Sequence, residues 1–65
     1  MPPFQFEVGD IVEVNARNVL AIVVGMTRRM DYMDKFTVRW RDEQGARIET
    51  LLTASELTGR RLARW

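Results

Sequence analysis

Alternating and apolar stretches along the chain predict an all-β protein. Four strands are expected, at residues 11–14, 19–26, 36–41 and 46–52. The third alternates most clearly, so Phe36, Val38 and Trp40 are expected to face a core while the residues between them face solvent. Residues 27–34 are polar and are expected to form a long loop.

Six consecutive apolar residues occupy positions 19–24. The run is too short for a buried helix and is rich in β-branched residues, so we expect a strand that is covered on both faces. In so small a protein only one of these faces can turn inward. Strand bending, the C-terminal tail or a second subunit could cover the other face. We favour the second subunit, which predicts a homo-oligomer.

The Glu-Gln-Gly sequence at residues 43–45 predicts a tight turn that sets the pairing of the third and fourth strands. A three-residue loop of this kind is a type I turn followed by glycine in the left-handed region. It would place Trp40 opposite Ile48, with both on the inner face. A loop one residue longer would set Trp40 opposite Arg47 and bury a charge, so the apolar pattern argues against that register.

The last part of the chain predicts a short helical turn before a final strand. Residues 53–56, Thr-Ala-Ser-Glu, have the Thr-x-x-Glu spacing of a capping box. Residues 60–65 could continue the helix or add a fifth strand, and we favour the strand. All of these elements belong to one expected domain, residues 1–65, with a core from about residue 6 to residue 62.

The composition limits the chemistry available to the chain. Its 65 residues are 46% hydrophobic and 29% charged, which is typical of a globular protein. Neither Cys nor His occurs, which removes disulfides, thiolate metal sites and the commonest general base. Ser55 is the only serine, and no His or Cys can activate it. We therefore expect no catalytic residues, no cofactor and no metal site: the protein is not expected to be an enzyme.

The hydropathy pattern also bears on location. No apolar run reaches about 18 residues, so no membrane partner is expected. Residues 1–4 lack the basic and apolar regions of a signal peptide. The expected location is therefore cytoplasmic.

Five short strands with a helical turn before the last one resemble an SH3-like barrel of the Tudor-like or KOW-like type. The residues that carry the resemblance are Phe6-x-x-Gly9-Asp10-x-Val12-x-Val14, Ala21-Ile22-Val23-Val24-Gly25, Thr37-Val38-Arg39-Trp40 and Ala54-Ser55-x-Leu57. They extend over about residues 6–62. The resemblance implies an all-β, five-stranded SH3-like (Tudor-like) barrel, a fold that hosts many unrelated functions.

A weaker resemblance is to the plasmid-borne type II dihydrofolate reductases, which are short barrels that assemble as tetramers around one active-site pore. The shared features are the Gly-Asp-x-Val start at residues 9–12, an Ile-Val-Gly-like strand and a helical turn ending in Leu57. The fourth strand of those enzymes carries Val-Gln-Ile-Tyr, where this chain has Arg47-Ile48-Glu49-Thr50. An enzyme assembled at an oligomer pore is therefore our third functional interpretation.

Charge is segregated along the chain, although the formal net charge is only +1. Residues 1–15 and residues 42–56 each carry a net charge of −3, whereas residues 16–41 carry +4 and the last six residues add three Arg. Nine of the ten basic residues are Arg, which suits bidentate contact with carboxylate or phosphate. Such segregation can survive folding as surface patches.

Six residues are candidates for binding: Arg28, Arg29, Tyr32, Arg39, Arg41 and Arg47. The predicted hairpin places Arg41 opposite Arg47, and an anion would relieve their repulsion. The alternative is that both side chains extend into water. Arg39 is expected to pair with Glu49. If the long loop curls onto this side, its two Arg would complete a phosphate-binding strip and its Tyr could stack on a base.

We therefore expect a non-enzymatic binding module that docks nucleic acid backbone or an acidic protein surface through these Arg residues. The alternative is a protein–protein adaptor or inhibitor that works through an apolar face, as a monomer or as a homo-oligomer. Nucleic acid binding requires the Arg residues on one face and should be sensitive to salt. An adaptor requires an exposed apolar patch, on the order of a few hundred Å².

Overall fold

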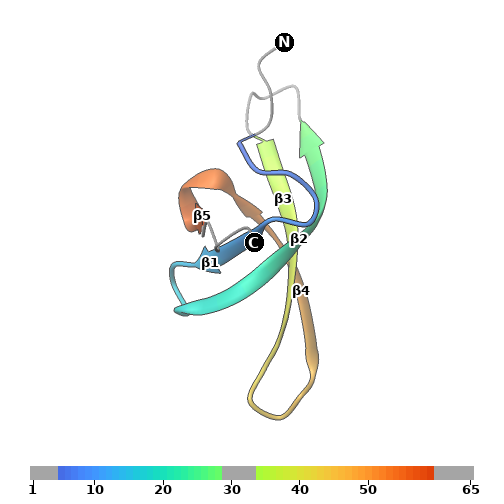
Figure 1. Cartoon of the computed structure of the whole chain (residues 1–65), viewed down its shortest axis with the longest axis vertical. Coiled ribbons are helices and arrows are strands. Elements are labelled where there is room, and N and C mark those ends of the chain that lie inside the picture. The colour runs from blue at the N-terminus through green and yellow to red at the C-terminus, as the bar shows by residue number, and fades with distance from the viewer. Residues whose placement is uncertain (1–4, 29–33, 60–65) are drawn as a thin grey trace, which may run out of the picture.

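The computed structural model describes residues 5–28 and 34–59. They form β1 (Ile11–Val14), β2 (Val19–Arg28), β3 (Asp34–Arg41), β4 (Arg47–Thr53), the 3-10 helix η1 (Ala54–Glu56) and β5 (Leu57–Gly59). Neighbouring strands are antiparallel, in the order β4-β3-β2-β1-β5 (Figure 1). The predicted all-β class, with five strands and a helical turn before the last one, is confirmed.

The sheet is open. Three successive hairpins build β1 to β4, and η1 then returns the chain to the far side of β1, where β5 pairs. β4 and β5 are therefore the two edges, and no ladder among the described residues joins them. Within the described residues, the closed barrel that the resemblance implied is not formed, because β5 pairs with β1 alone.

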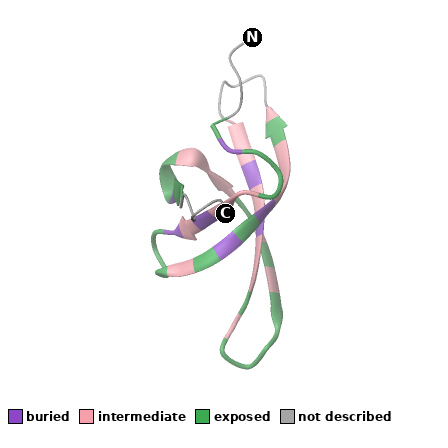
Figure 2. Cartoon of the chain, in the orientation of Figure 1, coloured by how far each residue is buried: buried purple, intermediate pink, exposed green. Residues whose placement is uncertain are grey.

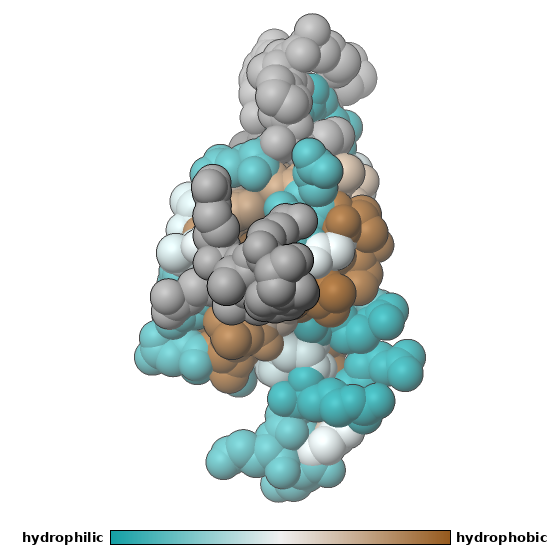
Figure 3. Space-filling view, viewed as in Figure 1, coloured by the Kyte–Doolittle hydropathy of each residue, from teal (hydrophilic) through white to brown (hydrophobic). Residues whose placement is uncertain are grey.

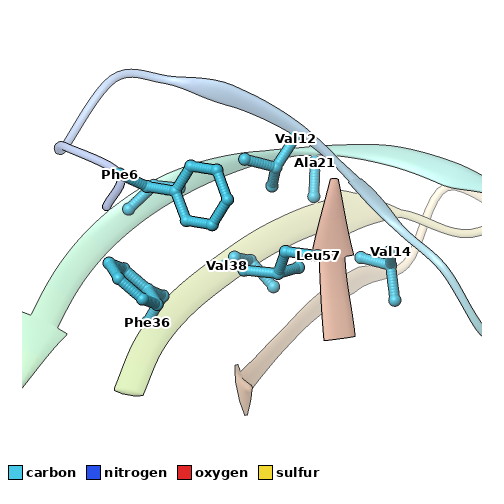
Figure 4. Close-up of a cluster of buried hydrophobic side chains, with 8 residues drawn as sticks. Phe6, Val12, Val14, Ala21, Phe36, Val38 and Leu57 are labelled. Carbon is cyan, nitrogen blue, oxygen red and sulfur yellow. The ribbon is translucent and has the colours of Figure 1, made fainter. Parts of the chain in front are cut away.

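One face of the sheet carries the core. It consists of eight buried apolar residues: Phe6, Val12, Val14, Ala21, Val23, Phe36, Val38 and Leu57. Phe6 precedes β1 and packs edge-on against Phe36, with ring centroids 5.2 Å apart. Leu57, brought in by η1, joins the same cluster (Figure 4). The segments before β1 and after η1 thus cover the inner face of the central strands.

The β3–β4 hairpin has the pairing predicted from its turn, with Trp40 opposite Ile48. Gly45 has a φ of 81°, in the left-handed region that other residues rarely adopt. Its N–H donates to the carbonyl of Asp42 at 2.9 Å, which closes the turn. Trp40 lies on the inner face as predicted, although it is only half-buried and packs at the border of the core.

β2 differs from the prediction in its length and in the burial of its two faces. It continues to Arg28, so Thr27 and Arg28, which were predicted to lie in the polar loop, belong to the strand. Ala21 and Val23 are buried, whereas Leu20 and Ile22 are 54% and 38% exposed. The alternating colours along β2 in Figure 2 show the same division. Within the described residues of one chain, only the face with Ala21 and Val23 is covered, because alternate side chains point toward the single core. Cover of the other face by the C-terminal tail or by a second subunit stays a prediction.

The capping box predicted at the helical turn is present. The Glu56 carboxylate accepts hydrogen bonds from the N–H and the hydroxyl of Thr53, both at 2.9 Å. The Asn15 N–H donates to the Glu56 carbonyl at 3.1 Å and ties the turn to the end of β1. β5 follows at once at Leu57–Gly59, earlier than the strand predicted at residues 60–65, which lie outside the described residues.

Candidate functional site

The outer face of the β3–β4 hairpin carries three of the six candidate residues. Side chains alternate along a strand, so Arg39 and Arg41 point away from the face that holds Val38. Arg41 lies opposite Arg47 in the ladder, which puts all three Arg on one side of the sheet. The structure therefore brings Arg39, Arg41 and Arg47 together as predicted. In Figure 3, hydrophilic residues dominate the lower end of the molecule, where Figure 1 shows the β3–β4 hairpin.

Arg39 is neutralised within the hairpin. Its Nε and Nη2 atoms donate to Oε2 of Glu49 at 3.0 and 2.8 Å, which confirms the predicted cross-strand ion pair. The side chains of Arg39 and Glu49 are 41% and 45% exposed. An ion pair this exposed adds little to stability, about 0.2–1 kcal/mol. Its main effect is to leave the outer face with less net positive charge than three Arg would give.

On the outer face, Arg41 and Arg47 form no ion pair with another described residue. Lys35 is on this face too, at the opposite end of β3 and near Glu56. Nη1 of Arg41 donates to the carbonyl of Gly45 at 2.8 Å, which turns this guanidinium toward the hairpin tip. Arg47 is exposed and makes no side-chain hydrogen bond or ion pair with another described residue. The nearby Asp42 carboxylate accepts through Oδ1 from the backbone N–H groups of Gln44 and Ala46, and it forms no ion pair with either Arg among the described residues.

Arg28 lies apart from these cations. It pairs with Asp34 at the far end of the β2–β3 hairpin, whereas Arg41 is seven residues further along β3. By alternation, Arg28 is on the same side of the sheet as Met26 and Phe36, the side opposite Arg41. The predicted strip therefore does not form between Arg28 and the outer-face Arg residues. Arg29 and Tyr32, the other two candidates, lie outside the described residues.

The Arg28–Asp34 contact is bidentate. Nε of Arg28 donates to Oδ1 of Asp34 at 2.9 Å, and Nη2 donates to Oδ2 at 3.0 Å. These hydrogen bonds raise the pKa of Arg28 and lower the pKa of Asp34. Because the carboxylate already occupies this guanidinium, Arg28 is poorly placed to bind an external anion.

Apolar side chains on the outer face were not among the predicted site residues. Leu20 and Ile22 of β2 are 54% and 38% exposed, and the half-buried Ile11 of β1 lies opposite Ile22. We call Ile11, Leu20 and Ile22 the outer patch. Leu51 of β4 adds a 49% exposed side chain on the same face, beyond Thr37.

The sequence held a signal for one of these residues. Leu51 alternates with Arg47 and Glu49, so the predicted register already placed it on the outer face. Leu20 and Ile22 had no such signal, because an uninterrupted apolar run does not show which of its faces turns outward.

The outer patch and the Arg residues adjoin each other. Ile22 lies directly opposite Arg39 in the β2–β3 ladder, and Arg39 lies opposite Glu49 on β4. Neighbouring strands are about 4.8 Å apart, so the outer patch borders the charged row of the hairpin. The outer face thus offers an apolar area beside the Arg39–Glu49 ion pair, with the guanidinium groups of Arg41 and Arg47 further toward the hairpin tip. This combination can bind an apolar group and, a short distance from it, an anion.

The described residues give little support for a metal site or for a membrane-spanning helix. Within 5–28 and 34–59, no three acidic side chains gather closely enough to share a metal ion. The one helix in these ranges, η1, has three residues and is too short to cross a membrane. The outer face is therefore the strongest candidate site that these residues present.

Comparisons with protein-family models, with curated proteins and with solved structures find no match to this chain. The function must therefore be argued from the outer face itself.

Proposed function

We propose that this chain is a non-enzymatic binding module that docks a partner protein on the outer face of its sheet. The partner contact combines an apolar group, seated on the outer patch, with a carboxylate that faces Arg41 and Arg47. The proposal includes a fold assignment: the strand order and the 3-10 turn support an SH3-like, Tudor-like domain whose sheet is open in this chain.

The observation that carries the proposal is the exposure of Leu20 and Ile22 on a face that also holds uncompensated cations. Exposed apolar side chains scattered singly need no explanation, but Leu20 and Ile22 are adjacent on one face and Ile11 extends them. Arg is enriched at protein interfaces because its planar group pairs with carboxylates while its stem packs on apolar groups. An acidic partner surface with an apolar centre fits this arrangement.

The test uses synthetic peptides of about 15 residues that combine acidic and apolar side chains, titrated into labelled protein and followed by NMR. We expect amide shifts to concentrate at the outer patch and at Arg41 and Arg47. Ile22→Asp should weaken peptide binding about tenfold or more, because it places a carboxylate in the apolar contact. Peptides in which Lys replaces each acidic residue should bind more weakly.

Val8→Asp is the matched control, because Val8 is 59% exposed but precedes the sheet. It introduces the same carboxylate and should leave the affinity unchanged. The proposal fails if Ile22→Asp and Val8→Asp behave alike, or if no acidic–apolar peptide shifts the outer face.

A nucleic acid backbone is the second candidate partner, because Arg41 and Arg47 form an uncompensated pair. Two phosphate contacts predict that affinity for short DNA or RNA falls about tenfold between 50 and 200 mM salt. Arg41→Ala should lower the slope of that dependence by about one. This result, with Ile22→Asp without effect, would favour nucleic acid over protein as the partner.

A further inference from the structure

β4 is an edge strand whose free backbone groups can be assigned. The Asp42 N–H donates to the Ala46 carbonyl at 3.0 Å, which makes this a hydrogen-bonded pair of the β3–β4 ladder. Such pairs recur at every second residue of an antiparallel ladder. The intervening residues Arg47, Glu49 and Leu51 therefore direct their N–H and C=O groups away from β3.

Thr53 agrees with this assignment. It continues the same series of alternate residues, and its N–H donates to the Glu56 carboxylate, off the β3–β4 ladder. No backbone hydrogen bond from Arg47, Glu49 or Leu51 to a loop or cap occurs among the described residues. These three residues form what we call the free edge of β4. A row of free N–H and C=O groups is a template for another strand.

The side chains of the free edge carry charges of both signs. Arg47 and Glu49 are two residues apart and point to the same outer face. Both hydrogen bonds from Arg39 end on Oε2 of Glu49, so the other carboxylate oxygen can accept from a second cation. The exposed guanidinium of Arg47 is such a cation, but it lies next to Glu49 along the same strand rather than across from it. The edge is therefore complementary to its own reversed copy.

We propose that β4 pairs antiparallel with β4 of a second copy of this chain, with Arg47 of each copy opposite Glu49 of the other. Each of these two residue pairs would exchange two backbone hydrogen bonds and one ion pair. The contact is two-fold symmetric and buries the same surface on both copies. Ile48 meets its own counterpart at the axis, on the inner face.

Charge selects this register over its neighbours. A shift that places Glu49 opposite its own copy sets two carboxylates against each other, which destabilises a sheet. The next shift places Arg47 opposite Thr53, whose N–H is already bound by Glu56. Only the proposed register pairs opposite charges twice while using free backbone groups.

The contact shares Arg47 with the proposed partner site but does not involve the outer patch. The outer patch is centred on β2, which β3 separates from the free edge. Loss of self-association would therefore not remove the outer patch, and loss of peptide binding in Ile22→Asp would not remove the free edge. The two proposals fail separately.

The test is sedimentation equilibrium of the full chain with two single variants and their mixture. An interface this small predicts a reversible dimer with a dissociation constant on the order of 10⁻⁴ M, weaker in high salt. Arg47→Glu creates two Glu–Glu contacts across the axis, and Glu49→Arg creates two Arg–Arg contacts. Each variant alone should associate about tenfold more weakly than the wild type.

The mixture is the decisive measurement. In a heterodimer of Arg47→Glu with Glu49→Arg, both cross-axis contacts again join opposite charges, so mixing should restore association. Misfolding cannot produce this rescue, and Arg47→Glu also faces Arg41 within its own hairpin, where it forms a favourable pair. Circular dichroism checks that both variants keep the wild-type fold.

Two results would overturn the proposal. One is a wild-type chain that remains monomeric at about 1 mM, well above the expected dissociation constant. The other is a dimer whose strength is the same in both variants and in their mixture, because the β4 edges would then not form the contact.

Discussion

The inner and outer faces of β3 are built from alternate residues of one strand. On the inner face, Phe36 and Val38 are completely buried. On the outer face, Thr37 and Arg39 are half-exposed and Arg41 is exposed. The inner residues pack into the core, whereas the outer ones contact only cross-strand neighbours, the hairpin turn and water.

This difference separates stability from binding. A core position is surrounded by side chains that cannot move independently, so a change there alters the free energy of unfolding. An outer position can change with little effect on folding, and its apolar and charged groups are available to a partner. The four predictions below test this division, beginning with the largest expected change in stability.

The largest effect is expected at Phe36. Phe36→Ala removes a ring that contacts Phe6, and should cost about 3–5 kcal/mol, enough to unfold so small a domain. Urea unfolding followed by circular dichroism measures the loss. Arg39→Ala, three residues away on the outer face, is the control and should cost less than about 1 kcal/mol. A Phe36→Ala protein as stable as the control would contradict the division between the faces.

The next largest effect is expected at Gly45, in the turn that sets the pairing of β3 with β4. Gly45→Val should cost about 1–2 kcal/mol, because φ at this residue is positive. Nothing lies within 4 Å of an added Cβ, so the cost comes from the backbone alone. Gly45→Asn should be milder, since Asn tolerates this region. Equal denaturation midpoints for the Val variant and the wild type would count against this turn.

The capping box at η1, the turn that connects the edge strand β4 to the buried Leu57, gives a pH-dependent effect. Hydrogen bonds from the Thr53 N–H and hydroxyl lower the pKa of Glu56 below its ordinary value of 4.5. A carboxylate with a lowered pKa in the folded state stabilises the fold above its unfolded pKa. That contribution is lost as pH falls through the folded pKa.

Gln can still accept the capping hydrogen bonds, so Glu56→Gln removes only the charge of an exposed group. It should cost roughly 0.5–1 kcal/mol at neutral pH and less in acid, where the wild type loses the same contribution. The pKa of Asp34 is also lowered, through its contact with Arg28, and this affects the wild type and the variant alike. The quantity to follow is therefore the difference in unfolding free energy between the wild type and Glu56→Gln. Unfolding free energies at several pH values between 2 and 7 measure it. A difference that stays constant with pH would show that the cap acts without the Glu56 charge.

The smallest effect is expected on the outer patch. Leu20→Ser should change the free energy of unfolding by about 0.5 kcal/mol or less, because the side chain is 54% exposed. Val23→Ser is the contrast on the same strand and should be far more destabilising, because it buries a hydroxyl in the core. If thermal unfolding shows both variants to be equally destabilised, contacts must cover the outer patch in the monomer.

The sequence alone was sufficient for the local features. The Glu-Gln-Gly turn and the alternation around it determined the β3–β4 register, including the Arg39–Glu49 ion pair. The Thr-x-x-Glu spacing determined the cap at η1. Each of these features depends on residues fewer than about a dozen positions apart, where turn geometry and strand periodicity leave few alternatives.

Tertiary structure decided which face of β2 points inward, because six apolar residues in a row have no alternation to read. Pairing of Val23 with Val38 turned Leu20 and Ile22 outward and so created the outer patch. Pairing also placed Arg28 beside Asp34 and away from Arg41. Finally, it left the sheet open, with β4 as an edge. These outcomes depend on contacts between distant segments, whose geometry the local sequence pattern does not contain.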